Sequence, residues 1–310
     1  MNGTVVVLTG GVGGSKLVAG LCAAIDPARV TAIVNTGDDF QHFGLHISPD
    51  VDTLTYTLAG LADPDRGWGR RDETWHFMET LALLGGPDWF SLGDRDLALH
   101  IERTRRLGAG ETLTKVTLDM AVRLGVRARI VPMSDDPCGV IVETDEGRLD
   151  FQSYFVARRC APRLTVISLD RSRVARPSKA ALDALAAPSI GAIIVAPSNP
   201  WLSIDPLLAV PGLVDAIKRA RAPVIAVTPL PGGRAVKGPT AKIMEELGLD
   251  LSIGTIVAHY HGLIDGIVAD MRDADPDRLP FVRTDTIMIS PDDRLRVARA
   301  ALELAGRLEE

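Results

Sequence analysis

Cysteine is scarce in this chain, whose 310 residues include only Cys22, Cys138 and Cys160. The three are odd in number and far apart, and their spacing is not that of a zinc site. We therefore expect no disulfide framework, which suits a reducing compartment, and we predict a cytoplasmic protein.

Aromatic residues are also few, at 5% of the chain, so we do not expect a stacking platform for single-stranded nucleic acid. The net charge of −6 argues against a nucleic acid or an anionic membrane as partner, although a local basic pocket remains possible. We find no signal peptide and no apolar run of membrane-spanning length. We expect small-molecule partners, no nucleic acid and no membrane.

The chain does have a large apolar fraction, 46% hydrophobic against 24% charged residues, and a length ample for a large core. In its second half, strand patterns alternate with helical patterns: strands at 164–169, 192–195 and 224–227, helices at 178–187 and 212–221. This alternation is typical of a parallel sheet covered by helices. We predict a single α/β domain over residues 1–310, with a Rossmann-like three-layer fold and a mostly parallel sheet.

The remaining segments complete this prediction. We expect strands at 4–7, 29–35 and 128–132, a hairpin between 139–143 and 149–154, and helices at 17–25, 52–60, 73–84, 94–107, 111–124 and 291–308. From 61 to about 125 no convincing strand pattern occurs. This stretch is predicted to be a helical insertion that caps the edge of the sheet.

The most informative segment is the glycine-rich turn from Leu8 to Lys16, which lies between a strand pattern and a helical pattern. Glycines let the backbone approach an anion, and the free N–H groups of the first helical turn point toward it. Lys16 adds a positive charge. This turn therefore predicts a phosphate site, whereas a glycine turn without a ligand is the simpler alternative.

Two common phosphate motifs do not match. A P-loop ends in Gly-Lys-Ser/Thr, but here Lys16 follows Ser15. The dinucleotide fingerprint needs a small third member where this chain has Lys16, and its second strand should end in an acidic residue where this chain has Asn35. Both departures disfavour a dinucleotide-dependent dehydrogenase.

Acidic side chains gather after the second predicted strand, at Asp38, Asp39, Asp50 and Asp52. The carboxyl ends of neighbouring parallel strands share one edge of a sheet, so these groups can lie beside the glycine turn. Carboxylates beside a phosphate repel it unless a cation lies between them, and Mg²⁺ is the usual one. The alternative is that these residues are helix caps and a solvated turn.

Four later loops are also candidates for ligand binding. They hold Arg95 at the start of a helix, Ser134 and Asp135 after a strand, Ser198 and Asn199 after a buried strand, and Lys237 and Gly238 before Pro239. We expect Pro239 in a first helical turn, so that the residues around it form a second anion site. Each loop taken alone could be turn punctuation. The histidines His42, His46, His76 and His100 lack the spacing of a metal pair and are expected to form hydrogen bonds.

Eight motifs occur together in register: Gly10–Gly14, Val34–Asp39, Ser48–Thr53, Arg66–Gly69, Leu92–Asp96, Pro132–Asp136, Ala196–Pro200 and Val236–Pro239. This set resembles the 2-phospho-L-lactate transferase family of coenzyme F-420 biosynthesis. The resemblance implies an Mg²⁺-dependent transfer of a phospho-linked three-carbon acid from a guanosine diphosphate conjugate to Fo (7,8-didemethyl-8-hydroxy-5-deazariboflavin). The terminal ribityl hydroxyl of Fo attacks phosphorus, and GMP leaves.

The resemblance also implies roles for individual residues. Asp50, Asp52 and Arg95 would be catalytic, and Asp39, Asp50 and Asp52 would hold the metal. Gly11–Gly14 would hold the diphosphate, Asp50 or Asp52 would contact Fo together with Arg95, and Ser198 and Asn199 would lie near guanosine. The full expected substrate-binding set is Gly10, Gly11, Val12, Gly13, Gly14, Lys16, Asn35, Thr36, Asp38, Asp39, Thr53, Ser134, Asp135, Ser198, Asn199, Lys237 and Gly238.

A non-catalytic regulatory protein of the same fold that binds nucleotide-sugars is the main alternative, because its family shares the first glycine turn. The segment Asn35–Phe40 favours the transferase, since the regulatory family has a glycine- and serine-rich loop at this place. The sequence leaves the acid open among lactyl, enolpyruvyl and phosphoglyceryl groups, which a pocket separates by only a few kcal/mol. A homodimer is the default expectation for the assembly.

Overall fold

The computed structural model of the chain describes residues 3–64, 66, 68–233, 239–276 and 279–309. The predicted anion-site residues Lys237 and Gly238 lie outside these ranges. Within these ranges no single helix is long and apolar enough to cross a membrane. Only the helices 200–209 and 213–219 taken together reach that length and apolarity, and they are bent by 83° to each other.

Seven parallel strands form the central sheet, in the order β12-β11-β10-β9-β1-β2-β5. Their bounds are β1 Thr4–Thr9, β2 Val30–Val34, β5 Arg129–Pro132, β9 Ile190–Val195, β10 Val224–Val227, β11 Gly266–Asp270 and β12 Phe281–Thr284. The chain first builds outward from β1 through β2 to β5, then returns to β9 on the other side of β1. The order therefore reverses between β1 and β9, which is where ligands bind in open α/β sheets.

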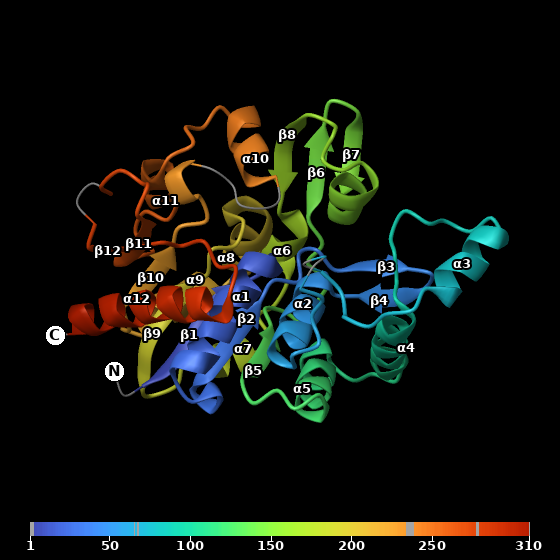
Figure 1. Ribbon diagram of the computed structural model, residues 1–310, viewed down its shortest axis with the longest axis horizontal. Helices are drawn as coiled ribbons and strands as arrows, with labels where there is room; N and C mark the ends of the chain where they lie inside the picture. The colour runs from blue at the N-terminus through green and yellow to red at the C-terminus, as the bar shows by residue number, and fades with distance from the viewer. Residues whose placement is uncertain (1–2, 65, 67, 234–238, 277–278, 310) are drawn as a thin grey trace.

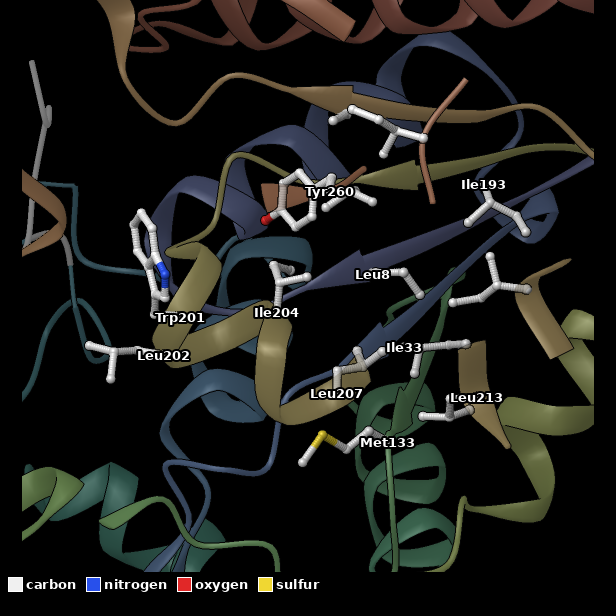
Figure 2. Close-up of a cluster of buried hydrophobic side chains, with 14 of the residues drawn as sticks. Leu8, Ile33, Met133, Ile193, Trp201, Leu202, Ile204, Leu207, Leu213 and Tyr260 are labelled. Carbon is white, nitrogen blue, oxygen red and sulfur yellow. The ribbon is translucent and has the colours of Figure 1, made fainter. Parts of the chain in front are cut away.

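Helices cover both faces of this sheet because its strands are apolar on both sides. Val5 and Val7 of β1 pack in one buried cluster with α1 (Gly11–Ala24) and α12 (Pro291–Glu309), which lie side by side in Figure 1. Val6 and Leu8 face the opposite cluster. Figure 2 shows part of that cluster, in which Ile204 and Leu207 lie near the strand residues Leu8 and Ile33, and Trp201 lies farther away.

Most other helices connect the sheet strands. They are η1 Pro27–Arg29, α2 Pro49–Leu58, α6 Asp170–Val174, α7 Lys179–Leu185, η3 Pro200–Ile204, α8 Asp205–Ala209, α9 Leu213–Arg219, η4 Pro231–Gly233, α10 Thr240–Glu246 and α11 Ile253–His259.

Two smaller units extend the carboxyl edge of the sheet (Figure 1). One is a three-stranded antiparallel sheet, β7-β6-β8, with the helical turn η2. The other is a two-stranded hairpin, β3-β4, followed by helices α3, α4 and α5. Their bounds are β3 Phe40–His42, β4 Leu45–Ile47, α3 His76–Leu83, α4 Asp94–Gly108, α5 Leu113–Arg123, β6 Ile141–Thr144, β7 Gly147–Asp150, η2 Ser153–Ala157 and β8 Leu164–Ser168.

The structure confirms the α/β fold with its parallel sheet and corrects several elements. The segment 164–169 was expected in the parallel sheet, but β8 pairs antiparallel with β6, and two of its five residues are exposed. The first helix begins at Gly11 rather than at residue 17, because the glycine turn itself is helical. Strands β3, β4, β11 and β12 were not predicted. Among the described residues of 61–125 no segment joins the central sheet, although the division into one domain with an insertion stays a prediction.

We expect Gly20→Ala to lower the free energy of unfolding by about 1–3 kcal/mol, because a Cβ there would overlap the backbone carbonyl oxygen of Arg294 on α12. Urea denaturation of the purified protein measures this change. The matched control is Gly306→Ala on α12, where a Cβ meets nothing within 4 Å. Helix propensity predicts that Gly306→Ala is neutral or stabilising by up to about 1 kcal/mol. Equal effects of the two changes would contradict the close helix packing.

Candidate active site

A cavity of about 730 Å³ opens at the carboxyl ends of the central strands. The turns after β1, β9 and β10 line it together with α2 and α4, and so do parts of both smaller units, at Phe90 and Phe155. The cavity therefore lies at the point where the strand order reverses, as the sheet topology predicts.

The glycine turn after β1 forms one wall of this cavity. Gly11 has a φ of +65°, a value that only glycine adopts without strain, and a Cβ at Gly13 would lie 2.6 Å from the carbonyl oxygen of Pro197. Gly10, Gly11, Val12 and Gly13 line the cavity where helix α1 begins, whereas Gly14 is buried behind them. The turn thus directs the positive end of the α1 dipole at the cavity.

Asp50 of α2 ties this turn to the loop after β2. Its carboxylate accepts from the Gly11 backbone N–H at 2.6 Å and from Asn35 Nδ2 at 2.9 Å, while Asn35 Oδ1 accepts from the Gly37 N–H at 2.8 Å. Burial raises the pKa of Asp50 to about 6, although both hydrogen bonds act in the opposite direction. An internal carboxylate therefore occupies part of the anion-binding end of α1.

Two further carboxylates have oxygen atoms without a donor. Asp38 is buried in the cavity wall, and burial, followed by the charges of Asp50 and Asp39, raises its pKa well above the usual value. The Oδ2 of Asp39 accepts from Ser48 at 2.6 Å and lies 3.0 Å from His46 Nε2. Oδ1 of Asp38 and Oδ1 of Asp39 are buried and have no partner. Such unpaired buried oxygens fit a bound cation.

These carboxylates do not form a complete metal cage. Among the residues that the structure describes, no group of three or more His, Cys, Asp or Glu side chains is arranged to hold a metal ion. Mg²⁺ commonly uses one or two carboxylates and takes its other ligands from water and substrate phosphates. The side chains present therefore suit a magnesium ion that arrives with a phosphate compound.

Asp52, two residues after Asp50, is matched by a different charge. Arg103 of α4 donates to both of its oxygens, and this arginine is only 2% exposed. His100 also belongs to this contact, since its Nδ1 lies 3.4 Å from Arg103 Nη1. Breaking such a buried pair costs about 3–5 kcal/mol, so Asp52 fixes α4 to α2.

Aromatic side chains form a large part of the remaining lining, here called the aromatic wall. Tyr56, Trp68, Trp89, Phe90, Phe151 and Phe155 line the cavity, although the chain has only seven Phe, four Trp and three Tyr. Arg66 lies 4.5 Å from the Trp75 ring centroid and 5.8 Å from that of Trp68, close enough for cation–π contact. The sequence-wide scarcity of aromatics hid their concentration at one site.

The turn after β9 supplies polar groups near the glycine turn. Ser198 Oγ accepts from the Gly10 N–H at 3.1 Å and donates to its carbonyl at 2.7 Å. Asn199 caps the helical turn η3 through its Oδ1 and donates to Thr240 Oγ1 at 3.0 Å. Lys16 donates to the Met288 carbonyl at 2.6 Å, which joins this wall to the segment after β12.

The structure does not bring every predicted residue to the cavity. The lining includes Asp50, Asp52, Thr53, Lys16, Asn35, Asp38, Ser198, Asn199, Gly10, Gly11, Val12 and Gly13, whereas Asp39 and Gly14 lie outside it. The Arg95 side chain is exposed outside the lining, and Asp135 is exposed and accepts from the Thr114 N–H. Ser134 is buried and donates to the Arg176 carbonyl, and Thr36 is buried behind the wall. The binding and catalytic roles of all the predicted residues stay predictions.

Sequence reasoning missed Tyr56, Asp96 and Arg103. A signal existed, because Asp52 and Tyr56 stand four residues apart, as do Asp96 and His100, and side chains at that spacing share one face of a helix. The motif ending at Asp96 was noted for Arg95 instead.

The profile of the family described as 2-phospho-L-lactate transferase CofD matches residues 5–299. A phosphoenolpyruvate transferase of Streptomyces griseus is 40% identical over 97% of this chain and 98% of its own length. One from Streptomyces coelicolor is 38% identical over 99% of both chains. A crystal structure of a UPF0052 family protein from Bacillus halodurans has the same fold, with a TM-score of 0.63 and 19% identity over 97% of this chain and 99% of that one.

The raised Asp50 pKa predicts a pH-dependent stability. The folded state holds this proton to about pH 6 and the unfolded chain only to about pH 4, so folding stability falls as pH rises through that window. We expect the ionisation of Asp50 to lower the free energy of unfolding by roughly 2 kcal/mol between pH 4.5 and pH 7. Urea denaturation in the presence of a chelator measures the free energy of unfolding against pH for the wild-type protein and for Asp50→Asn. The difference between the two curves isolates Asp50, because the other groups titrate in both proteins. Parallel curves would contradict the assignment.

Proposed function

The chain belongs to the 2-phospho-L-lactate transferase CofD family, and on this premise we propose that it moves a phospho-linked three-carbon acid from a guanosine diphosphate conjugate to Fo. GMP would be the leaving product, and the reaction would belong to coenzyme F-420 biosynthesis. A cytoplasmic location and a homodimer are parts of the same proposal.

The observation that carries this proposal is the contrast between the two walls of one cavity. A turn suited to phosphate and a wall of aromatic rings face a common space of about 730 Å³. Ligand sites of this type commonly have volumes of 300–1,000 Å³. A flat deazaflavin would lie against Trp89 and Phe90, with its ribityl chain directed toward Gly11.

The diphosphate would take the glycine-turn end. The N-terminus of α1 favours negative charge, and Lys16 lies in the same wall. Ser198, Asn199 and Thr240 offer hydroxyl and amide groups beside this turn, where the nucleoside of a guanosine diphosphate conjugate would extend.

We propose Asp38 and Asp50 as the residues that would hold Mg²⁺. Asp38 has an unpaired buried oxygen, and Asp50 lies against Gly11, where phosphate would bind. Asp39 stands behind them, and Asp52 is engaged by Arg103, so both are less suited as ligands. When bound, the ion would neutralise charge on the phosphates. The protein's own part is to position the substrates and to exclude water.

For the donor, we propose the enolpyruvyl conjugate. The Streptomyces relatives at 38–40% identity are named phosphoenolpyruvate transferases. Acids that differ by a methyl, a methylene or a hydroxymethyl-type group are separated by only a few kcal/mol, so near-full-length similarity is a better guide than any single lining residue.

Mass spectrometry of the product tests the activity and the donor together. The protein is incubated with Fo, GTP, Mg²⁺, the partner guanylyltransferase and one acid at a time: phosphoenolpyruvate, 2-phospholactate or 3-phosphoglycerate. We expect the Fo adduct with phosphoenolpyruvate to form fastest. No adduct with any acid would overturn the transferase proposal. A faster reaction with another acid would overturn only the donor. A nucleotide-sugar-binding protein would leave Fo fluorescence unchanged.

We expect Asp50→Ala to lower the transfer rate at least 100-fold, since the diphosphate would lose its metal-binding partner. Asp38→Asn is expected to raise the Mg²⁺ concentration that gives half-maximal rate by tenfold or more. Glu102→Gln on the exposed side of α4 is the matched control and should stay within twofold of the wild-type rate. Full activity of both aspartate variants at low Mg²⁺ would exclude these two residues as metal ligands.

A further inference from the structure

Five polar side chains, together with the α2 backbone between Asp52 and Tyr56, form a ring that joins α2 to α4. Asp52 and Tyr56 come from α2, and Asp96, His100 and Arg103 come from α4. Arg103 binds Asp52, His100 lies between Arg103 and Asp96, and the Tyr56 hydroxyl donates to Asp96 Oδ1. The spacings along each helix place these groups on one face, so both helices contribute to a single network.

The arginine fixes the tautomer of the histidine in this ring. Arg103 only donates hydrogen bonds, so His100 Nδ1, 3.4 Å from Arg103 Nη1, accepts. The ring proton is then on Nε2, which lies 3.2 Å from Asp96 Oδ2. Tyr56 and His100 are each 1% exposed, so the groups that face Asp96 are held rigidly.

Asp96 is the member of the ring that remains open to the cavity. It lines the cavity, and its side chain is 15% exposed. Burial acts to raise its pKa, but the nearby His100 ring, the hydrogen bond from Tyr56 and the charge of Arg103 outweigh burial, so the pKa is lowered and the group is ionised at neutral pH.

The other carboxylates in the lining have different partners. Asp50 accepts from Gly11 and Asn35, and Asp52 is bound at both oxygens by Arg103. Asp38 is the proposed partner of the cation. Asp96 is paired with the hydroxyl of Tyr56 and the ring of His100 rather than with an arginine or a lysine, and it lines the same cavity as the aromatic residues and the glycine turn.

Resting on the proposed function, we propose that Asp96 is a catalytic residue that binds the attacking primary hydroxyl of the acceptor and accepts its proton. As the oxygen forms a bond to phosphorus, its O–H bond breaks and the proton passes to the Asp96 carboxylate. The bond from phosphorus to the GMP oxygen breaks, and its electron pair leaves with GMP. Tyr56 and His100 are positioning residues that direct the carboxylate. A weakly basic aspartate suffices, because phosphoryl transfer needs the hydroxyl oriented more than strongly activated.

Chemical rescue of Asp96→Ala tests this role. With Fo, the guanosine diphosphate donor and Mg²⁺, we expect kcat to fall at least 100-fold, while the KM for the donor stays within threefold. Added formate, which fits the space of the lost carboxylate, should raise the kcat of the variant at least tenfold, and this rise should saturate with the formate concentration. The raised rate should fall at low pH, where formate is protonated. Glu102→Gln is the control and should show neither loss nor rescue.

A second variant guards against misfolding. Tyr56→Phe removes one donor to Asp96 and should lower kcat about tenfold, with Fo binding by fluorescence nearly unchanged. Two results would overturn the assignment of Asp96. One is that Asp96→Ala keeps the wild-type activity to within threefold. The other is that a folded, Fo-binding Asp96→Ala variant loses activity and formate does not restore it. A wild-type protein without transfer activity would instead overturn the proposed function.

Discussion

The site depends on the carboxylate of Asp50, which joins three parts of the chain. Its oxygens accept from the glycine turn after β1 and from Asn35 after β2, while its backbone belongs to α2. Burial makes this arrangement costly in the absence of a ligand, as the raised pKa indicates. A cation that arrives with a diphosphate would offset this cost, so the free protein is prepared for a charged ligand at the expense of stability.

The helices α2 and α4 carry this local constraint to the other side of the cavity. The buried pair of Asp52 and Arg103 and the contacts of Asp96 hold α4 in place, and the aromatic side chains before α4 line the same cavity as the glycine turn. In the proposed function, the sheet topology would fix where the phosphates lie. The polar ring would fix how far the acceptor lies from them.

The parts of the fold that follow local patterns were predicted from sequence. The glycine turn, the parallel strands around it and the aspartates after β2 all depend on residue types at short spacing. Strand β8 was misassigned because a short apolar run does not tell whether its partners are parallel. The place of Arg95 and the ring around Asp96 depend on how α4 packs against α2, which is tertiary information that no single segment contains.

The central claim is that one cavity holds a guanosine diphosphate at the glycine turn and a deazaflavin at the aromatic wall at the same time. Titration of Fo fluorescence with the wild-type protein, with and without saturating GDP and Mg²⁺, tests it most directly. We expect Fo to bind equally well or more tightly when GDP and Mg²⁺ are present. Displacement of Fo by GDP would contradict it.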